Sequence, residues 1–167
     1  IILPGPPGEL VPMFNESVRG FLKKYSDGAI VSHTVNIIGM GESSVAEEIE
    51  DMFDAKNPTV APYAKSGEVR LRITAKAETA DEADKMCAPV VDEICSRLGD
   101  VVYGTDMNSI EERVVALLKE KGKKIATAES CTAGYIPKRL TDIPGASEVF
   151  ECGIVSYSND IKTKLLG

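Results

Sequence analysis

The sequence predicts a mixed fold made of α/β and α+β units, and three observations support this prediction. Strand and helix patterns alternate along the 167 residues. Two adjacent strand patterns in the middle of the chain are separated only by a short turn. The core must be aliphatic, because aromatic residues make up 5% of the chain while hydrophobic residues make up 43%. A chain of this length and composition forms one large domain or two small ones.

The first block covers residues 1–29 and is expected to form a strand, a loop and a helix. Ile1-Ile2-Leu3 has the pattern of a short buried strand and leads into a rigid Pro/Gly loop, and apolar residues at helical spacing follow over residues 9–25. Residues 26–28, Ser-Asp-Gly, end this helix with turn chemistry. Because the apolar start precedes the loop without an initiator Met, we expect a strand cut from a larger domain.

The second block, residues 30–106, has the order strand, helix, hairpin, helix, strand, which predicts a small α+β unit. Its first helix is expected to use Ser43 or Ser44 as its N-cap and to be broken at Asn57-Pro58. Its second helix is expected to open at Thr79 with an acidic first turn. The expected strands are residues 33–38, 59–63, 68–77 and 101–103, and the expected hairpin turn is Lys65-Ser66-Gly67.

The third block, residues 107–167, alternates helix and strand and therefore predicts a doubly wound sheet. Its strands are expected at residues 125–128 and 149–156, and a helix is expected to open within residues 129–134 and to run through Leu140. Two strands are too few to complete such a sheet, so we expect this block to be truncated. Further helices are expected at residues 110–121 and 161–166.

Charge and cysteine content argue against several classes of function. The formal net charge of -7 argues against broad binding to nucleic-acid phosphates or anionic membranes, which requires clustered Lys and Arg. His33 is the only histidine, which argues against a zinc site and against a Ser-His-Asp triad. No apolar run approaches the roughly 20 residues that span a bilayer. Cysteines without close or regular spacing predict reduced thiols and a cytoplasmic protein, and they are Cys87, Cys95, Cys131 and Cys152.

The segment most indicative of chemistry is residues 127–134, Thr-Ala-Glu-Ser-Cys-Thr-Ala-Gly, which follows an apolar strand and opens a helix. Backbone N–H groups at such a place can stabilise an anion, and Ser130 lies where a nucleophile would act. The alternative is that Ser130 or Thr132 simply caps the helix. Cys131 is the chemical rival to Ser130, although a small buried neighbour is the simpler interpretation.

A second segment supplies groups that could activate a serine. Tyr157 and Lys162 lie about one and a half helical turns apart after the neighbouring strand. With no usable histidine, Lys or Tyr must act as the base of any serine hydrolase here. Taken alone, Lys162 would be a solvated helix cation and Tyr157 a packing residue at a strand edge.

Four separated segments carry a resemblance to a known family. They are LPGPPGEL at residues 3–10, NPTVAPYAKSGEVRLRITA at 57–75, TAESCTAG at 127–134 and LTDIPGASEVFECGIVSYSNDIKTKLLG at 140–167. In this order they resemble the CinA family of competence/damage-inducible proteins, and the resemblance covers essentially the whole chain. It implies the C-terminal end of a molybdopterin-binding-like α/β domain in residues 1–29, a KH-type α+β domain in 30–106, and the N-terminal part of an α/β amidase domain in 107–167.

The resemblance also implies a reaction and the residues that perform it. The C-terminal domain of the family is a nicotinamide-nucleotide amidohydrolase, which converts nicotinamide mononucleotide to nicotinate mononucleotide and ammonia. The implied nucleophile is Ser130, with Tyr157 and Lys162 as its activating partners. The family usually has Gly where this chain has Ala133. No cofactor is implied for the amidase part, and a divalent metal only for the N-terminal domain that is expected to be missing. The implied substrate-binding residues are Glu129, Cys131, Thr132, Ala133 and Gly134.

Other functions remain open at this point. The chain by itself is expected to be inactive, because half a sheet cannot form a substrate pocket. The KH-type block could instead serve assembly or bind nucleic acid, but residues 39–42, Gly-Met-Gly-Glu, lack the helix-bounded GxxG that clamps a nucleic-acid backbone. The resemblance also associates ADP-ribose pyrophosphatase activity with the missing N-terminal domain. We expect a homo-oligomer, because a cut strand at residues 1–3 leaves an unpaired edge. The net charge of -7 argues against a nucleic-acid partner and against membrane association.

Overall fold

The computed structural model describes residues 1–25, 27–65 and 67–167. Ser26 and Ser66, which belong to two of the expected turns, lie outside the described residues. The fold is mixed α/β, with a four-stranded antiparallel sheet, a separate parallel pair of strands, and helices. Among the described residues, we find no helix with the length and apolar character that crossing a membrane requires.

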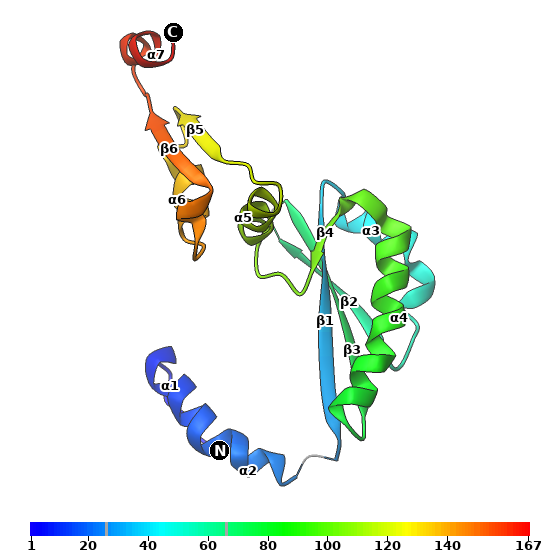
Figure 1. Ribbon diagram of the computed structural model, residues 1–167. Helices are drawn as coiled ribbons and strands as arrows, with labels where there is room; N and C mark the ends of the chain where they lie inside the picture. Colours follow the sequence, from blue (N-terminus) through cyan, green and yellow to red (C-terminus); the bar gives the residue numbers. More distant parts are fainter. Residues whose placement is uncertain (26, 66) are drawn as a thin grey trace.

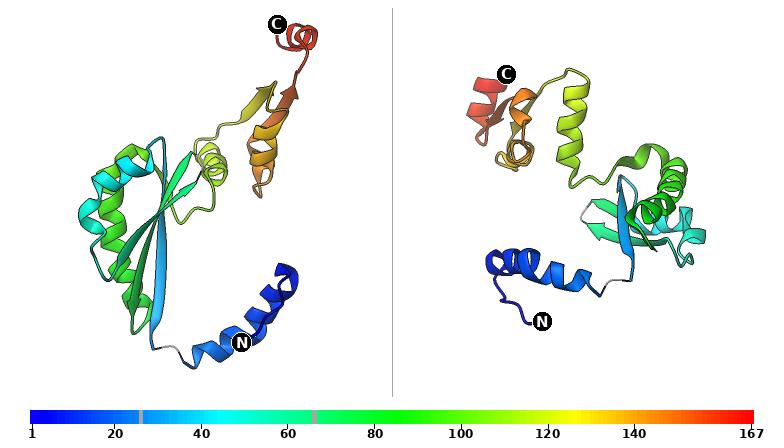
Figure 2. Two further views of the ribbon diagram at one scale, coloured as in Figure 1. Left: turned by 180° about the vertical axis from the view of Figure 1, so that it is seen from behind. Right: turned by 60° about the horizontal axis from the view of Figure 1, so that its bottom comes forward.

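The N-terminal segment is helical and contributes no buried residue. Helix α1 (Pro7–Met13), a π-helical turn (Phe14–Val18) and helix α2 (Arg19–Lys23) follow one another. They extend away from the sheet (Figure 1; Figure 2). The helix expected here is confirmed, but the strand expected at residues 1–3 is wrong, because Ile1 and Ile2 are 73% and 98% exposed and pair with no described strand. A strand requires a neighbour for its backbone hydrogen bonds, and this segment has none among the described strands.

The middle of the chain forms an antiparallel sheet with two helices on one face (Figure 1). Its elements are β1 (Ala29–Ile38), α3 (Glu42–Glu48), β2 (Thr59–Lys65), β3 (Glu68–Ala77), α4 (Ala80–Leu98) and β4 (Val102–Thr105). The strands lie in the order β2-β3-β1-β4. The expected order of strand, helix, hairpin, helix and strand is therefore confirmed.

Alternation along the strands directs one face of this sheet into an aliphatic core. On β3, Leu71 and Ile73 are fully buried, while Arg70 and Arg72 lie on the opposite face. The apolar side of α4 packs against the buried face, and the burial of Cys87 there makes this thiol a core residue. The buried members of this core are Val35, Ile37, Val45, Ile49, Val60, Val69, Leu71, Ile73, Ala75, Ala83, Cys87, Ile94 and Leu98.

The two helix starts of this unit differ in their caps. At α4, the Thr79 hydroxyl accepts a hydrogen bond from the Glu82 N–H at 3.2 Å, and the Glu82 carboxylate accepts from the Thr79 N–H at 3.2 Å, so the predicted cap is confirmed. At α3, the N-cap is Gly41 and no side chain caps the helix. The N-cap expected at Ser43 or Ser44 is wrong, because the helix starts at Glu42 and both serines lie inside it. The helix also ends well before the expected proline break.

The C-terminal part of the chain is built on two parallel strands. Its elements are α5 (Ile110–Glu120), β5 (Ile125–Glu129), α6 (Tyr135–Thr141), β6 (Phe150–Val155) and α7 (Asn159–Leu166). The two strands pair in parallel, joined by a crossover that contains α6. Helix α7 projects beyond the ends of the strands (Figure 2). A second, smaller core holds this part together, and its buried members are Val115, Leu140, Ala146 and Val149.

Helix α6 begins later than the sequence pattern predicts. Its first residue is Tyr135, whereas the helix was expected to open within residues 129–134. Ala133 and Gly134 have φ values of 51° and 91°, and these left-handed conformations cannot continue an α-helix. Residues 130–134 therefore form a turn between β5 and α6, and this turn holds most of the predicted site.

Candidate functional site

The ends of β5 and β6 lie side by side at one edge of the parallel pair. Glu129, the last residue of β5, is in register with Val155, the last residue of β6. One further hydrogen bond continues the pairing, from the Ser156 N–H to the Glu129 carbonyl at 2.8 Å. Ser130 directly follows β5, and Tyr157 is two residues beyond β6. The fold thus brings together the two segments that the sequence analysis selected.

Residues 130–134, here called the serine turn, are held by backbone hydrogen bonds. The Ala133 N–H donates to the Ser130 carbonyl at 3.1 Å, and the Tyr135 N–H donates to the Thr132 carbonyl at 3.0 Å. Ser130 is half-buried and Thr132 is exposed. The N-cap of α6 is Gly134, and no side chain caps the helix. The alternative that Ser130 or Thr132 caps this helix is therefore wrong.

The other residues of the serine turn differ in exposure. Cys131 and Ala133 are exposed, so the interpretation of Cys131 as a small buried neighbour is wrong. Gly134 is half-buried, and a Cβ atom at this position would lie 3.3 Å from Cγ2 of Val155. The turn therefore approaches the end of β6 closely at Gly134 and faces solvent at Cys131.

Glu129 is the most buried residue of the predicted site. It is 6% exposed, and its Oε2 atom accepts a hydrogen bond from the Ile136 N–H at 3.3 Å. Its Oε1 atom is buried and has no hydrogen-bond partner among the described residues. The carboxylate therefore contacts the first turn of α6, directly after the serine turn.

The second predicted segment lies at the start of α7. The Ser158 hydroxyl accepts from the Ile161 N–H at 3.4 Å and caps the helix, and Lys162 lies in its first turns. Tyr157 is 75% exposed, and Lys162 is half-buried. Among the described residues, no hydrogen bond joins the side chains of Ser130, Tyr157 and Lys162 to one another. The strand ends are adjacent, while the three side chains do not form a hydrogen-bonded triad in this structure.

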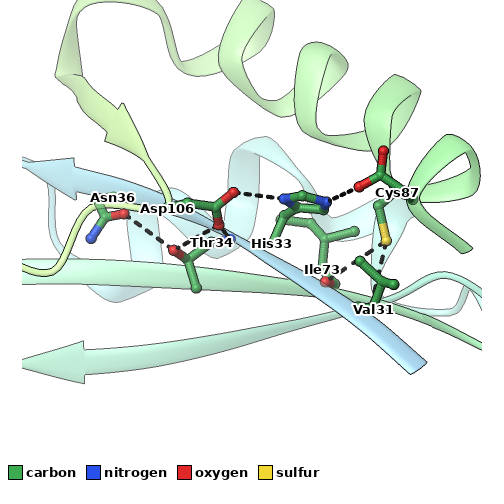
Figure 3. A network of polar contacts seen from close by, with 8 residues as sticks. Val31, His33, Thr34, Asn36, Ile73, Cys87 and Asp106 are labelled. Carbon is green, nitrogen blue, oxygen red and sulfur yellow. Dashed lines mark hydrogen bonds and ion pairs between the residues drawn. The ribbon is translucent and has the colours of Figure 1, made fainter. Parts of the chain in front are cut away.

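A second polar cluster, which the sequence analysis missed, surrounds the only histidine (Figure 3). His33 of β1 points toward α4, where its Nε2 atom lies 2.9 Å from Oδ1 of Asp84. Its Nδ1 atom lies 2.6 Å from Oδ2 of Asp106, just after β4. The hydrogen bond to Asp106 raises the pKa of His33, partial burial opposes this, and the bond to Asp84 adds to the upward shift. One feature of the sequence could have indicated this cluster. His33 precedes Val35 and Ile37 at a spacing of two residues, which places it on the same face of the strand as these core residues.

Asp106 is held by its backbone as well as by its side chain. Its N–H donates to the Thr34 carbonyl at 2.8 Å, and its Oδ1 atom accepts from the Thr34 N–H at 2.7 Å. Partial burial acts to raise the pKa of Asp106, but the hydrogen bonds from His33 and Thr34 outweigh it and lower the pKa. Its φ of 54° is in the left-handed region, which Asp tolerates better than most residues.

The two residues after Asp106 are also bonded to the sheet, on the face opposite the one that α4 covers. The Asn36 side-chain amide donates to the Met107 carbonyl at 3.1 Å. The Arg70 guanidinium donates to the carbonyls of Met107 and Asn108 at 3.2 and 3.1 Å. Residues 106–108, here called the junction, are therefore fixed to the antiparallel sheet immediately before α5 begins.

No group of three or more His, Cys, Asp or Glu side chains with the arrangement of a metal site occurs in the part of the chain that the structure describes.

Comparison with known proteins identifies both parts of the chain. The family model of the damage-inducible protein CinA KH domain matches residues 32–104, and that of the CinA C-terminal domain matches residues 107–167. The chain belongs to the CinA family. The junction lies where the two CinA matches meet.

Curated members of the CinA family align with the whole chain. A competence-damage inducible protein of Clostridium beijerinckii is 58% identical over 168 residues, which cover 100% of this chain and 41% of the relative. A CinA-like protein of Desulfovibrio desulfuricans is 50% identical over 167 residues, which cover 100% of this chain and 39% of the relative. The chain thus spans about two fifths of the length of these relatives. A solved structure, the competence/damage inducible protein CihA from Agrobacterium tumefaciens, is 41% identical over 35% of each chain with a TM-score of 0.34.

Proposed function

We propose that residues 107–167 carry the nucleophile and the activating groups of a serine amidase that hydrolyses nicotinamide mononucleotide to nicotinate mononucleotide and ammonia. The observation that supports this proposal is the adjacency of the β5 and β6 ends, with Ser130 after one strand and Tyr157 and Lys162 after the other. In α/β proteins, ligands bind at the carboxyl ends of parallel strands. The serine turn lies at this edge, and α6 begins after it without a side-chain cap.

The chemistry assigned to each group follows from its type. The Ser130 hydroxyl oxygen attacks the carboxamide carbon, and Lys162 or Tyr157 accepts the hydroxyl proton. Backbone N–H groups that follow Ser130 stabilise the developing oxyanion. The same proton then goes to the departing nitrogen, which leaves as ammonia, and water hydrolyses the acyl-serine ester to the carboxylate. The half-buried Lys162 and the exposed Tyr157 are both available for the base role, so single variants must decide between them.

The test measures ammonia release from nicotinamide mononucleotide by a protein of the relatives' full length that contains this chain, called the full-length protein below. Ser130→Ala is expected to lower kcat by about a thousandfold or more, because the attacking atom is removed. Ser147→Ala is the matched control, since this exposed serine lies outside the strand-end edge. Equal activity of Ser130→Ala and the wild type would refute the proposal.

The three-part organisation is part of the same proposal. We assign residues 1–29 to the end of a molybdopterin-binding-like domain, 30–106 to the KH-type domain and 107–167 to the amidase domain. The fixed junction supports a spacer role for the KH-type domain, because it ties the start of α5 to the antiparallel sheet.

Self-association of the chain is proposed from the exposed apolar side chains of α1 and α2. Light scattering after size-exclusion chromatography tests it.

A further inference from the structure

We propose that Glu129 is a positioning residue that holds the serine turn in place, because its carboxylate accepts a hydrogen bond from the first turn of α6. It is assigned this role in place of direct contact with the substrate. Its effect on turnover rests on the proposed amidase function, whereas its effect on the turn does not.

Glu129 connects the three elements that meet at the site. As the last residue of β5 it directly precedes Ser130. Its carbonyl accepts the Ser156 N–H at 2.8 Å, which fixes the end of β6 just before Tyr157. Its carboxylate accepts the Ile136 N–H at 3.3 Å, which fixes the first turn of α6. The serine turn is therefore held at both ends by one residue.

The Glu129 carboxylate takes the place of an ordinary side-chain cap at the start of α6. The N-cap residue of α6 is Gly134, which has no side chain to accept a hydrogen bond from the first turn. The Glu129 carboxylate reaches across from the strand and accepts from one of those N–H groups instead. Ala133, in the left-handed region, adds backbone strain that the surrounding contacts must hold.

Burial of the Glu129 carboxylate costs hydration free energy, which its contacts must offset. A charged group in an apolar setting loses much hydration, and one hydrogen bond recovers only part of that free energy. Glu129 is 6% exposed and its Oε1 atom has no partner among the described residues. An apolar side chain at this position could not accept the Ile136 N–H. The acceptor is thus what the carboxylate provides.

The experiment compares Glu129→Ala, Glu129→Gln and the exposed-site control Glu151→Ala in the full-length protein. Hydrogen–deuterium exchange is followed in peptides that span residues 130–140. Glu129→Ala is expected to speed exchange at Ile136 by about tenfold, which corresponds to the loss of one hydrogen bond. Glu129→Gln keeps an amide oxygen acceptor, so its exchange is expected to stay close to that of the wild type and of Glu151→Ala.

Turnover of nicotinamide mononucleotide supplies the second readout. A displaced serine turn is expected to lower kcat of Glu129→Ala by about 10- to 100-fold with little change in KM, and Glu129→Gln is expected to recover most of this loss. If Glu129→Gln loses as much kcat as Glu129→Ala while its exchange stays slow, the charge acts on the reaction directly and the positioning role is refuted. Unchanged exchange in Glu129→Ala also refutes it. If the wild type does not hydrolyse the nucleotide, the proposed function fails, and the exchange data still decide whether Glu129 holds the turn.

Discussion

Neutralising one partner of His33 tests whether this side chain fastens the junction to the sheet in a pH-dependent way. The perturbation is Asp106→Asn, which keeps the size of the side chain but removes its charge. Asp84→Asn is the matched comparison on the other ring nitrogen. Because His33 is the only histidine in the chain, its imidazole resonances can be followed without ambiguity by NMR.

The sign of the effect follows from the direction of the pKa shift. The pKa of His33 is raised above its ordinary value of 6.5, so the folded state binds the proton more tightly than the unfolded state. The stabilisation is therefore fully present below a pH of about 6.5 and is lost as the pH rises through the folded-state pKa. The pKa of Asp106 is lowered from 3.8, so its contribution is present above that pH and lost as the pH falls through its folded-state pKa. The interaction between His33 and Asp106 is therefore strongest between the folded-state pKa of Asp106 and that of His33.

The magnitude follows from geometry and exposure. Hydrogen bonds to charged groups contribute about 1.5 to 3 kcal/mol when buried, and exposed ion pairs contribute about 0.2 to 1 kcal/mol. Asp106 and Asp84 are 51% and 58% exposed, so solvent screening moves both bonds toward the lower range. We expect Asp106→Asn to lower the free energy of unfolding by about 1 kcal/mol at pH 5.5 and by clearly less at pH 9.

The assay combines the NMR titration of His33 with urea unfolding at both pH values. Asp106→Asn is expected to lower the pKa of His33 more than Asp84→Asn does, because the hydrogen bond to Asp106 is the largest cause of the upward shift. A His33 pKa at or below 6.5 in the folded wild type would refute the reasoning. A stability loss in Asp106→Asn that is equal at both pH values would refute it as well.

Three further predictions concern the stability of the chain. Leu71→Ala removes a fully buried side chain from the core of the antiparallel sheet and is expected to lower the free energy of unfolding by about 3 kcal/mol in urea, whereas a loss below 1 kcal/mol would mean that this core is poorly packed. Thr79→Ala removes the cap of α4 and is expected to lower it by about 1 kcal/mol, and Thr79→Ser should retain most of the wild-type stability if the hydroxyl is the cause. Ala133→Gly relieves about 1 to 2 kcal/mol of left-handed backbone strain and loses about 0.4 to 1 kcal/mol through the more flexible unfolded chain. We therefore expect a small gain in thermal stability from Ala133→Gly, and a lower midpoint would contradict the positive φ at this position.

The antiparallel unit could be predicted closely because its local signals agree with its packing. Alternating residues on β3 fix which face is buried, and Thr79 with Glu82 marks the start of α4 through contacts three residues apart. The N-cap prediction at Ser43 or Ser44 failed because serine is also accommodated inside a first turn. The strand predicted at residues 1–3 failed because apolar content alone does not supply a pairing partner.

The candidate site could be predicted only in part. The order of elements indicated that Ser130 and Tyr157 follow neighbouring strands, and parallel pairing placed them at one edge. The start of α6 could not be predicted, because the left-handed conformation of Ala133 is not the preference of alanine and follows from the contacts around the turn. The hydrogen bond from the Ile136 N–H to the Glu129 carboxylate could not be predicted either, since it links a helix to a strand across a turn and has no recurring sequence spacing.

The two strained positions of the chain have a common arrangement. Asp106 and Ala133 are the two non-glycine residues with positive φ in the part of the chain that the structure describes. A carboxylate accepts a backbone N–H at or near each one: that of Asp106 itself from Thr34, and that of Glu129, four residues before Ala133, from Ile136. A left-handed residue persists only where other contacts over-determine the backbone, and a charged acceptor gives a stronger hydrogen bond than a neutral one. One of these points fixes the junction to the antiparallel sheet and the other fixes the serine turn to the parallel strands. The same physical device therefore sets the geometry at the boundary between the two CinA matches and at the proposed nucleophile.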